Sequence, residues 1–88
     1  MKNHSFKIAW ALHRVMECFA EYPRQELSAG DVVLIHYLKF DSVITKKAVY
    51  SITYLAKNQR LIKQSAPRLY QITQQGLHYA AKEIKDHE

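Results

Sequence analysis

Apolar residues recur every three or four positions in several segments of the chain, which is the spacing of a helix with one buried face. The first segment predicts a helix over about residues 5–22, and Pro23 ends it. The second predicts a helix over about residues 28–40, because Ser28 and Asp31 match the Ser-x-x-acid pattern that caps a helix start. The residues expected to be buried in these two helices are Ile8, Leu12, Val15, Met16, Phe19, Val32, Leu34, Ile35 and Leu38.

A third helix is predicted over about residues 45–58, with Thr45 as its N-cap. Its expected buried face consists of Ala48, Val49, Ile52, Leu55 and Ala56. The opposite face is basic and rich in tyrosine, and carries Lys46, Lys47, Tyr50, Tyr54 and Lys57, with Ser51, Thr53 and Asn58 at its flanks. Two placements of Tyr50 and Tyr54 stay open at this point: exposure on the outer face, or packing against the first helix.

After Asn58 the pattern changes to two short strand-like segments, residues 60–64 and 69–72. The tetrad Ser65-Ala66-Pro67-Arg68 between them suits a turn, so we expect a hairpin over about residues 60–72. A last helix over about residues 73–86 follows, with Thr73 as its cap. The predicted fold is mainly α with a small β-hairpin, in the order helix, helix, helix, hairpin, helix. With 88 residues, the chain is expected to form a single domain, 1–88.

The charges are distributed unevenly along the chain. Five cations balance five anions over residues 1–44, whereas positions 42–82 contain no Asp or Glu. The cations of the second half are Lys46, Lys47, Lys57, Arg60, Lys63, Arg68 and Lys82. Such concentrated positive potential is typical of proteins with a polyanionic partner. The alternative is a solvated basic face that maintains solubility.

Two helices joined by a short turn, the second with a basic outer face, are what a helix-turn-helix requires. The chain resembles the winged helix-turn-helix family over residues 27–84, and more loosely the MarR-like repressors of that family. The resemblance is carried by Leu27-Ser28-Ala29-Gly30-Asp31, by Thr45-Lys46-Lys47-Ala48-Val49, by the stretch Tyr54 to Ile62, and by Leu69-Tyr70-Gln71-Ile72-Thr73-Gln74-Gln75-Gly76-Leu77. The last of these is similar to the family's y-x-L-T-x-x-G ending.

The chain departs from the family pattern at two places. Only residues 41–44 separate the second and third helices, where the family has a further helix of about eight residues. Either the helix over residues 28–40 therefore takes the positioning role, or the motif is abbreviated. Gln59-Arg60 replaces the family's glycine before the wing, so we expect Asn58 to adopt the left-handed conformation that ends the helix.

The resemblance implies a sequence-specific regulator of transcription, expected to be a repressor, that binds double-stranded DNA. The third helix would enter the major groove, and the basic hairpin would contact phosphates. The implied DNA-binding residues are Thr45, Lys46, Lys47, Tyr50, Ser51, Tyr54, Lys57, Arg60, Lys63 and Arg68. Because the helix face carries no Arg, phosphate contacts are expected to outweigh base reading. The hairpin cations also suit a second role, as charges that protect an exposed strand edge from aggregation.

A core this small favours self-association, and we expect a homodimer. Its interface is expected to contain Phe6, Trp10, His13, Leu77, Ala81 and Ile84. Two other functions remain open. In an adaptor that binds a regulatory protein, Phe6, Trp10 and the tyrosines would form the partner surface. In an RNA-binding module, the tyrosines would stack on unpaired bases.

The remaining chemistry of the sequence is sparse. Cys18 is the only cysteine, which excludes a disulfide framework, and the scattered histidines do not suggest a metal site. No nucleophile motif or phosphate-binding glycine loop is present, so we expect neither an enzyme nor a bound cofactor. No apolar run approaches the ~18–20 residues that span a bilayer, and the start of the chain does not look like a signal peptide. A cytoplasmic protein without a membrane partner is therefore expected.

Overall fold

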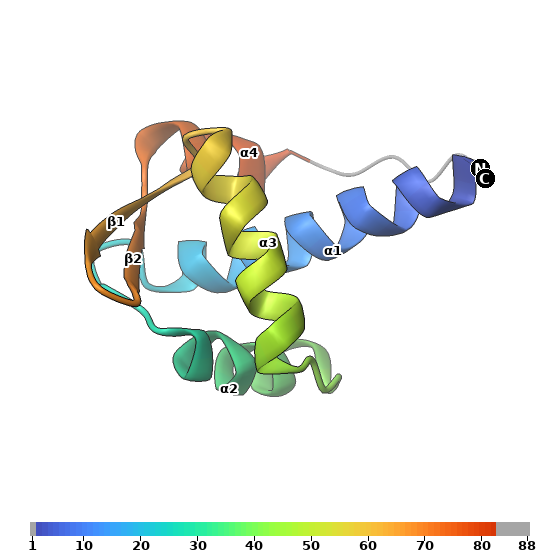
Figure 1. Ribbon diagram of the computed structural model, residues 1–88, viewed down its shortest axis with the longest axis horizontal. Coiled ribbons are helices and arrows are strands. Elements are labelled where there is room, and N and C mark those ends of the chain that lie inside the picture. The colour runs from blue at the N-terminus through green and yellow to red at the C-terminus, as the bar shows by residue number, and fades with distance from the viewer. Residues whose placement is uncertain (1, 83–88) are drawn as a thin grey trace.

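The computed structural model describes residues 2–82, and side chains from Ile8 to Lys82. Within these residues it contains four helices and one two-stranded antiparallel hairpin, which confirms the mainly helical fold with a small hairpin (Figure 1). In chain order the elements are α1 (Lys2–Glu21), α2 (Ala29–Phe40), α3 (Lys46–Asn58), β1 (Ile62–Ala66), β2 (Leu69–Ile72) and α4 (Gln74–Ala81). The last helix was expected to reach about residue 86. It ends at Ala81, with Lys82 extended, and residues 83–86 lie outside the described part of the chain.

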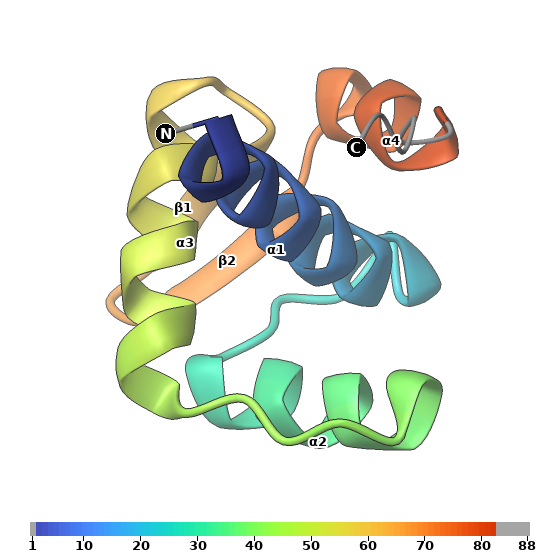
Figure 2. The same cartoon turned by 90° about the vertical axis from the view of Figure 1, so that its right-hand side faces the viewer.

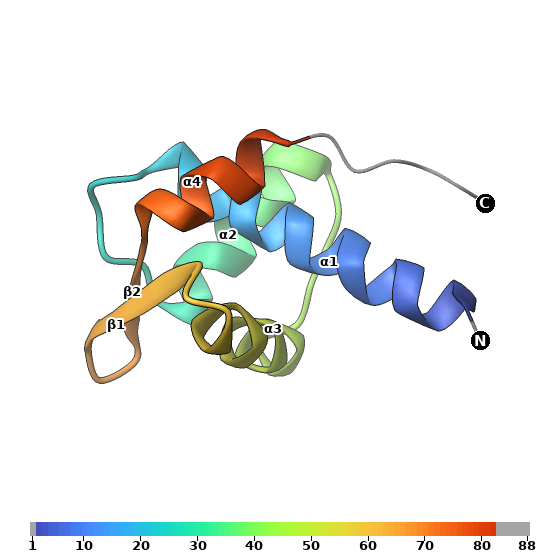
Figure 3. The same cartoon turned by 90° about the horizontal axis from the view of Figure 1, so that it is seen from above.

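The core lies where α1 crosses the middle of the molecule. Figure 2 shows α2 below α1, α3 along one side and α4 above, and Figure 3 shows the hairpin beside the end of α3. The largest fully buried side chains come from α1, α2, α3 and β1, and are Phe19, Met16, Ile62, Val15, Val32, Val49 and Cys18. Tight burial of apolar side chains from four elements fixes the positions of these elements relative to one another.

Side-chain caps begin α2 and α3, as the sequence predicts. Ser28 Oγ accepts the Asp31 N–H at 3.2 Å, and Asp31 Oδ2 accepts the Ser28 N–H at 2.9 Å, which completes a capping box. Thr45 Oγ1 accepts the Ala48 N–H at 3.1 Å at the start of α3. Between the two helices, Asp41 has a φ of 53° and ends α2 in the left-handed conformation.

The buried face of α2 differs from the prediction. Leu38 and Leu34 were expected in the core but are 72% and 58% exposed, and His36 is buried instead. Apolar residues lie on nearly every side of α2, so periodicity alone could not identify the side that packs. His36 tolerates burial because its Nδ1 donates to the Ser42 carbonyl at 2.9 Å, which also holds the turn into α3.

Two further buried positions were predicted wrongly. Ile8 is exposed because the first half of α1 extends beyond the other helices (Figure 1). On α3, Leu55 is exposed and Thr53 is buried. The Thr53 hydroxyl donates to the Tyr50 carbonyl at 2.9 Å, and this bond satisfies the hydroxyl inside the core.

The hairpin has a shorter turn than the sequence suggests. Because β1 continues to Ala66, which pairs with Leu69, only Pro67 and Arg68 form the turn, and Arg68 has a φ of 64°. A register shift between Gln64 and Ala66 absorbs the extra residue. In the part of the hairpin near its tip, Leu27 and Tyr70 exchange backbone hydrogen bonds of 2.7 and 3.0 Å, which join the α1–α2 connection to β2.

The turn from α3 to β1 contains the other correction. Arg60, not Asn58, adopts the left-handed conformation, with a φ of 63°. The Arg60 N–H donates to the Lys57 carbonyl, and the Leu61 N–H donates to the Ala56 carbonyl at 2.9 Å. This pair of bonds is a Schellman motif, and its left-handed residue is the second one after the last helical residue, Asn58.

The first turn of α4 lies directly on the α3–β1 turn. The Thr73 N–H donates to the Leu61 carbonyl at 3.0 Å, and Thr73 Oγ1 lies 2.8 Å from the Arg60 carbonyl oxygen. The same hydroxyl oxygen accepts the Gly76 N–H at 3.0 Å, which caps α4. A Cβ atom on Gly76 would overlap the Leu61 carbonyl oxygen and come within 2.7 Å of Ile72 Cγ1. Glycine is therefore required here for space, since its φ is not positive.

This close approach predicts that Gly76→Ala is strongly destabilising. Overpacking of a core ordinarily costs about 1–3 kcal/mol, and we expect at least the upper end because the clash is with backbone. Gly30→Ala in α2 is the matched control, because the nearest atom to its new Cβ would be Lys46 Cε at 3.6 Å. Alanine favours a helix by up to about 1 kcal/mol, so this control should match or exceed the wild type. Urea unfolding measures both, and equal stabilities would contradict the argument.

Candidate nucleic-acid interface

The outer side of α3 is a continuous polar and aromatic surface. Its buried residues, Val49, Ile52, Thr53 and Ala56, face the core. All seven residues that the resemblance assigned to DNA on this helix and its cap are exposed: Thr45, Lys46, Lys47, Tyr50, Ser51, Tyr54 and Lys57. Tyr50 and Tyr54 are 47% and 68% exposed, so neither packs into the interior against α1. The helix therefore presents ammonium groups, hydroxyls and aromatic rings to the surroundings.

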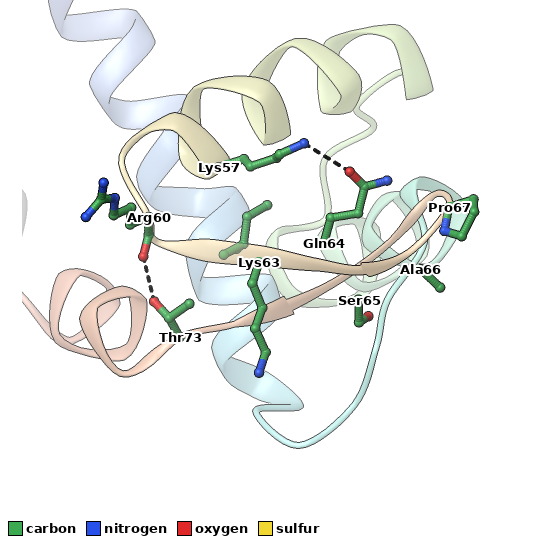
Figure 4. A pocket seen from close by; sticks show the side chains of 9 residues that line it. Lys57, Arg60, Lys63, Gln64, Ser65, Ala66, Pro67 and Thr73 are labelled. Carbon is green, nitrogen blue, oxygen red and sulfur yellow. Dashed lines mark hydrogen bonds between the residues drawn. The ribbon is translucent and has the colours of Figure 1, made fainter.

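Contacts at both ends connect α3 to neighbouring elements. At its start, Lys46 extends along α2, with its Cε 3.6 Å from the place of a Cβ on Gly30. At its end, Lys57 Nζ donates to Gln64 Oε1 on β1 at 3.0 Å (Figure 4). Thr45 Oγ1 is already occupied as the helix cap. Lys47, Tyr50 and Tyr54 then form the central part of the surface.

The three cations of the hairpin lie apart from one another. Arg60 belongs to the α3–β1 turn and Arg68 to the tip, and both are exposed. Figure 4 shows Lys63 pointing to the opposite side of the hairpin from Gln64, which faces α3. Strand alternation explains the difference, since successive side chains of β1 point to opposite faces. The sequence indicates Lys63 as a cation of the hairpin and assigns no role to Gln64, which lies on the same face of β1 as the buried Ile62.

An open groove runs between the end of α3 and the hairpin. It is lined by Lys57, Arg60, Ile62, Lys63, Gln64, Ser65, Ala66, Pro67 and Thr73 (Figure 4). Every charged residue of this lining is a cation, because positions 42–82 hold no Asp or Glu. The groove and the outer side of α3 are thus suited to an anionic ligand.

The residues expected at a dimer interface meet in a second groove, between α1 and α4. Trp10, His13, Leu77 and Ala81 all line it, whereas the side chain of Phe6 and residue Ile84 lie outside the described part. Trp10 is 40% exposed, with the Arg14 guanidinium 5.5 Å from its ring centre. The exposed part of this indole ring therefore borders the groove.

His13 has a role within the fold that the sequence did not reveal. Its side chain is buried, and Nε2 donates to the Lys82 carbonyl at 2.7 Å. Its Nδ1 lies 2.9 Å from Glu17 Oε2, and its ring packs 5.7 Å from that of Tyr79. This imidazole therefore holds the end of α4 on α1, and its contact with a second copy stays a prediction. No sequence signal marks it, since its acceptor is a backbone carbonyl 69 residues away.

The remaining candidate groups do not form a site. Burial raises the pKa of the Cys18 thiol to about 12, and the opposing effect of Lys39 is smaller. A thiol that stays protonated is a poor nucleophile. Within residues 2–82, no three His, Cys, Asp or Glu side chains are placed to hold a metal ion. None of the described helices is both long and apolar enough to cross a membrane.

Comparison with known proteins gives no relative: no family description, curated protein or solved structure matches the chain.

The Cys18 pKa predicts how stability depends on pH. The thiol has an ordinary pKa of 9.0 when unfolded and about 12 when folded, so both states are protonated below about pH 9. Above that value the unfolded chain ionises first, and stability falls by at most about 1.4 kcal/mol per pH unit. Urea unfolding at several pH values measures the free energy of unfolding of the wild type and of Cys18→Ala. The difference between these two free energies should become smaller from pH 9 upward. A gap independent of pH up to 10.5 would contradict the assignment.

Proposed function

We propose that this chain binds double-stranded DNA and regulates transcription as a winged helix-turn-helix protein, with α3 in the major groove. One observation carries the proposal. The exposed face of α3 presents Lys46, Lys47, Tyr50 and Tyr54, and the surrounding stretch of residues 42–82 holds cations but no Asp or Glu. A helix of this kind fits the major groove, and its ammonium groups can neutralise phosphates on either side.

The arrangement of the elements supports a winged helix. The order of three helices, hairpin and helix, with Leu27 bridged to Tyr70 beside β2, is compatible with that family. On this assignment α2 is the positioning helix and α1 the first helix, which is the first of the two alternatives that the short turn at residues 41–44 left open. The bond from His36 to the Ser42 carbonyl holds this turn, which leads into α3.

The proposed contacts divide into two groups. Lys47, Tyr50, Ser51 and Tyr54 face the groove, where tyrosine hydroxyls can bond phosphates or bases and the rings can contact thymine methyl groups. Lys46, Lys57, Arg60 and Arg68 lie around this centre and are suited to phosphates. Lys63 points away from α3 and adds to the positive potential of the hairpin (Figure 4). Without Arg on α3, phosphate contacts supply most of the affinity.

A homodimer completes the proposal. The groove between α1 and α4, bordered by Trp10, Leu77 and Ala81, is the surface that we assign to the second copy. A two-fold axis there would present two α3 helices to the same side of the duplex. Half-sites separated by one turn of DNA, ~34 Å, and a palindromic operator would follow.

A salt titration with a 30-base-pair duplex of random sequence tests the proposal. Log affinity should fall linearly with log salt, and Lys47→Ala should reduce the slope by ~0.9 because one phosphate contact is lost. Arg24→Ala is the matched control: it removes one exposed cation from the α1–α2 connection, outside α3 and the hairpin, and should leave the slope unchanged. Fluorescence anisotropy of the labelled duplex measures both variants.

Two results would overturn the proposal. If the chain did not bind the duplex even at low salt, DNA binding would be excluded. If Tyr54→Ala weakened binding to a single strand more than to the duplex, stacking on unpaired bases would be the better account.

A further inference from the structure

The exposed side of α2 is apolar. The helix buries Ala29, Val32 and His36, while Leu34, Tyr37 and Leu38 on its other side remain 49–72% exposed. A helix that is apolar around most of its circumference is normally covered on most of it. Clustered large apolar side chains on a surface commonly mark an interaction site.

These side chains border a groove between α2 and the end of α1. Two adjoining hollows share Tyr22, Ile35 and Leu38, and one of them continues along Leu34 and Leu27. We call this the α2 groove and define its apolar floor as Tyr22, Leu34, Ile35 and Leu38. Leu34 and Leu38 are one helical turn apart, so the floor can receive two apolar side chains with the same spacing.

The rim of the α2 groove is acidic. Glu26 and Asp31 line one hollow and are exposed, and Glu21 lines the other, where it accepts a hydrogen bond from Lys39 Nζ at 3.0 Å. All acidic residues within the described part of the chain lie between Glu17 and Asp41. The α2 groove is thus on the acidic side of a protein whose formal net charge is +5.

We propose that the α2 groove binds an amphipathic basic helix of a partner protein. Apolar side chains at positions i and i+4 of that helix would occupy the floor, and its Lys or Arg side chains would face Glu26 and Asp31. This is recognition of a helix by a groove, with charge complementarity providing the orientation. A symmetric pairing of two copies through this groove fits less well, because it would bring the acidic rim of each copy, with Glu26 and Asp31, towards that of the other.

The α2 groove is separate from the proposed DNA-binding surface. Figure 2 shows α3 at one end of α2 and the last turn of α1 over the other end. A helix bound beside Tyr22 and Leu38 would leave Tyr50 and Tyr54 accessible. The proposal therefore does not rest on DNA binding, and it can be tested in the absence of DNA.

The test uses two labelled synthetic peptides of 18 residues with the same leucines at i, i+3 and i+4. One has lysine at its polar positions and the other has glutamate. Anisotropy with the full chain should show binding of the lysine peptide at least tenfold tighter than of the glutamate peptide. Leu38→Gln should weaken binding of the lysine peptide at least tenfold. Val43→Gln is the matched control, since Val43 is 78% exposed but does not line the groove, and should stay within twofold of wild type.

The charge of the rim is tested with Glu26→Lys. This substitution should weaken binding of the lysine peptide at least fivefold and reduce the salt dependence of that binding. Equal binding of the two peptides, or equal losses for Leu38→Gln and Val43→Gln, would overturn the proposal. Sedimentation equilibrium of the chain alone provides the last control. Self-association that Leu38→Gln abolishes would show that a second copy occupies the groove, which also overturns the proposal.

Discussion

The contact between Gly76 and the Leu61 carbonyl is the constraint on which the arrangement of α3 and the hairpin depends. It brings the first turn of α4 against the turn that leaves α3, so that Thr73 can bond the Arg60 and Leu61 carbonyls. Those carbonyls belong to the Schellman ending of α3, where a left-handed Arg60 directs the chain into β1. The orientation of the hairpin relative to α3 therefore depends on these contacts around the α3–β1 turn, together with the bond from Lys57 on α3 to Gln64 on β1.

Local signals were sufficient to predict most helix starts. Ser28, Thr45 and Thr73 were each recognisable as caps because a cap acts within three residues of sequence. The identity of the buried face of α2 was not predictable in the same way. The structure buries His36 and leaves Leu38 exposed. Burial of the imidazole requires a hydrogen-bond partner, and that partner is the Ser42 carbonyl, which comes within reach only in the folded turn. The left-handed residue was predicted at Asn58 and is Arg60 for a similar reason, since the Schellman bonds place it two positions beyond Asn58.

In the candidate site too, some features follow from local sequence and others depend on contacts made only in the folded chain. The period of α3 predicted Lys47 on its outer face but left two placements open for Tyr50 and Tyr54, and the structure has all three residues on the surface. The hairpin was harder, because the direction of each side chain depends on the phase of a strand of five residues. A shift of one position exchanges Lys63 for Gln64 as the residue that faces α3. Long-range contacts such as that of His13 with the Lys82 carbonyl leave no trace in local sequence.

The two proposed surfaces share one cause, the separation of charge along the chain. Because the acids of the described part end at Asp41 and the cations of α3 begin at Lys46, the turn between α2 and α3 is also an electrostatic boundary. The helix α2 contributes to both surfaces. Its buried residues Val32 and His36 position α3, while its exposed leucines form part of the floor of the acidic groove. A ligand on the exposed side would cover apolar surface without disturbing the buried one. DNA and a basic partner would then approach different faces, each attracted by the charge that repels the other.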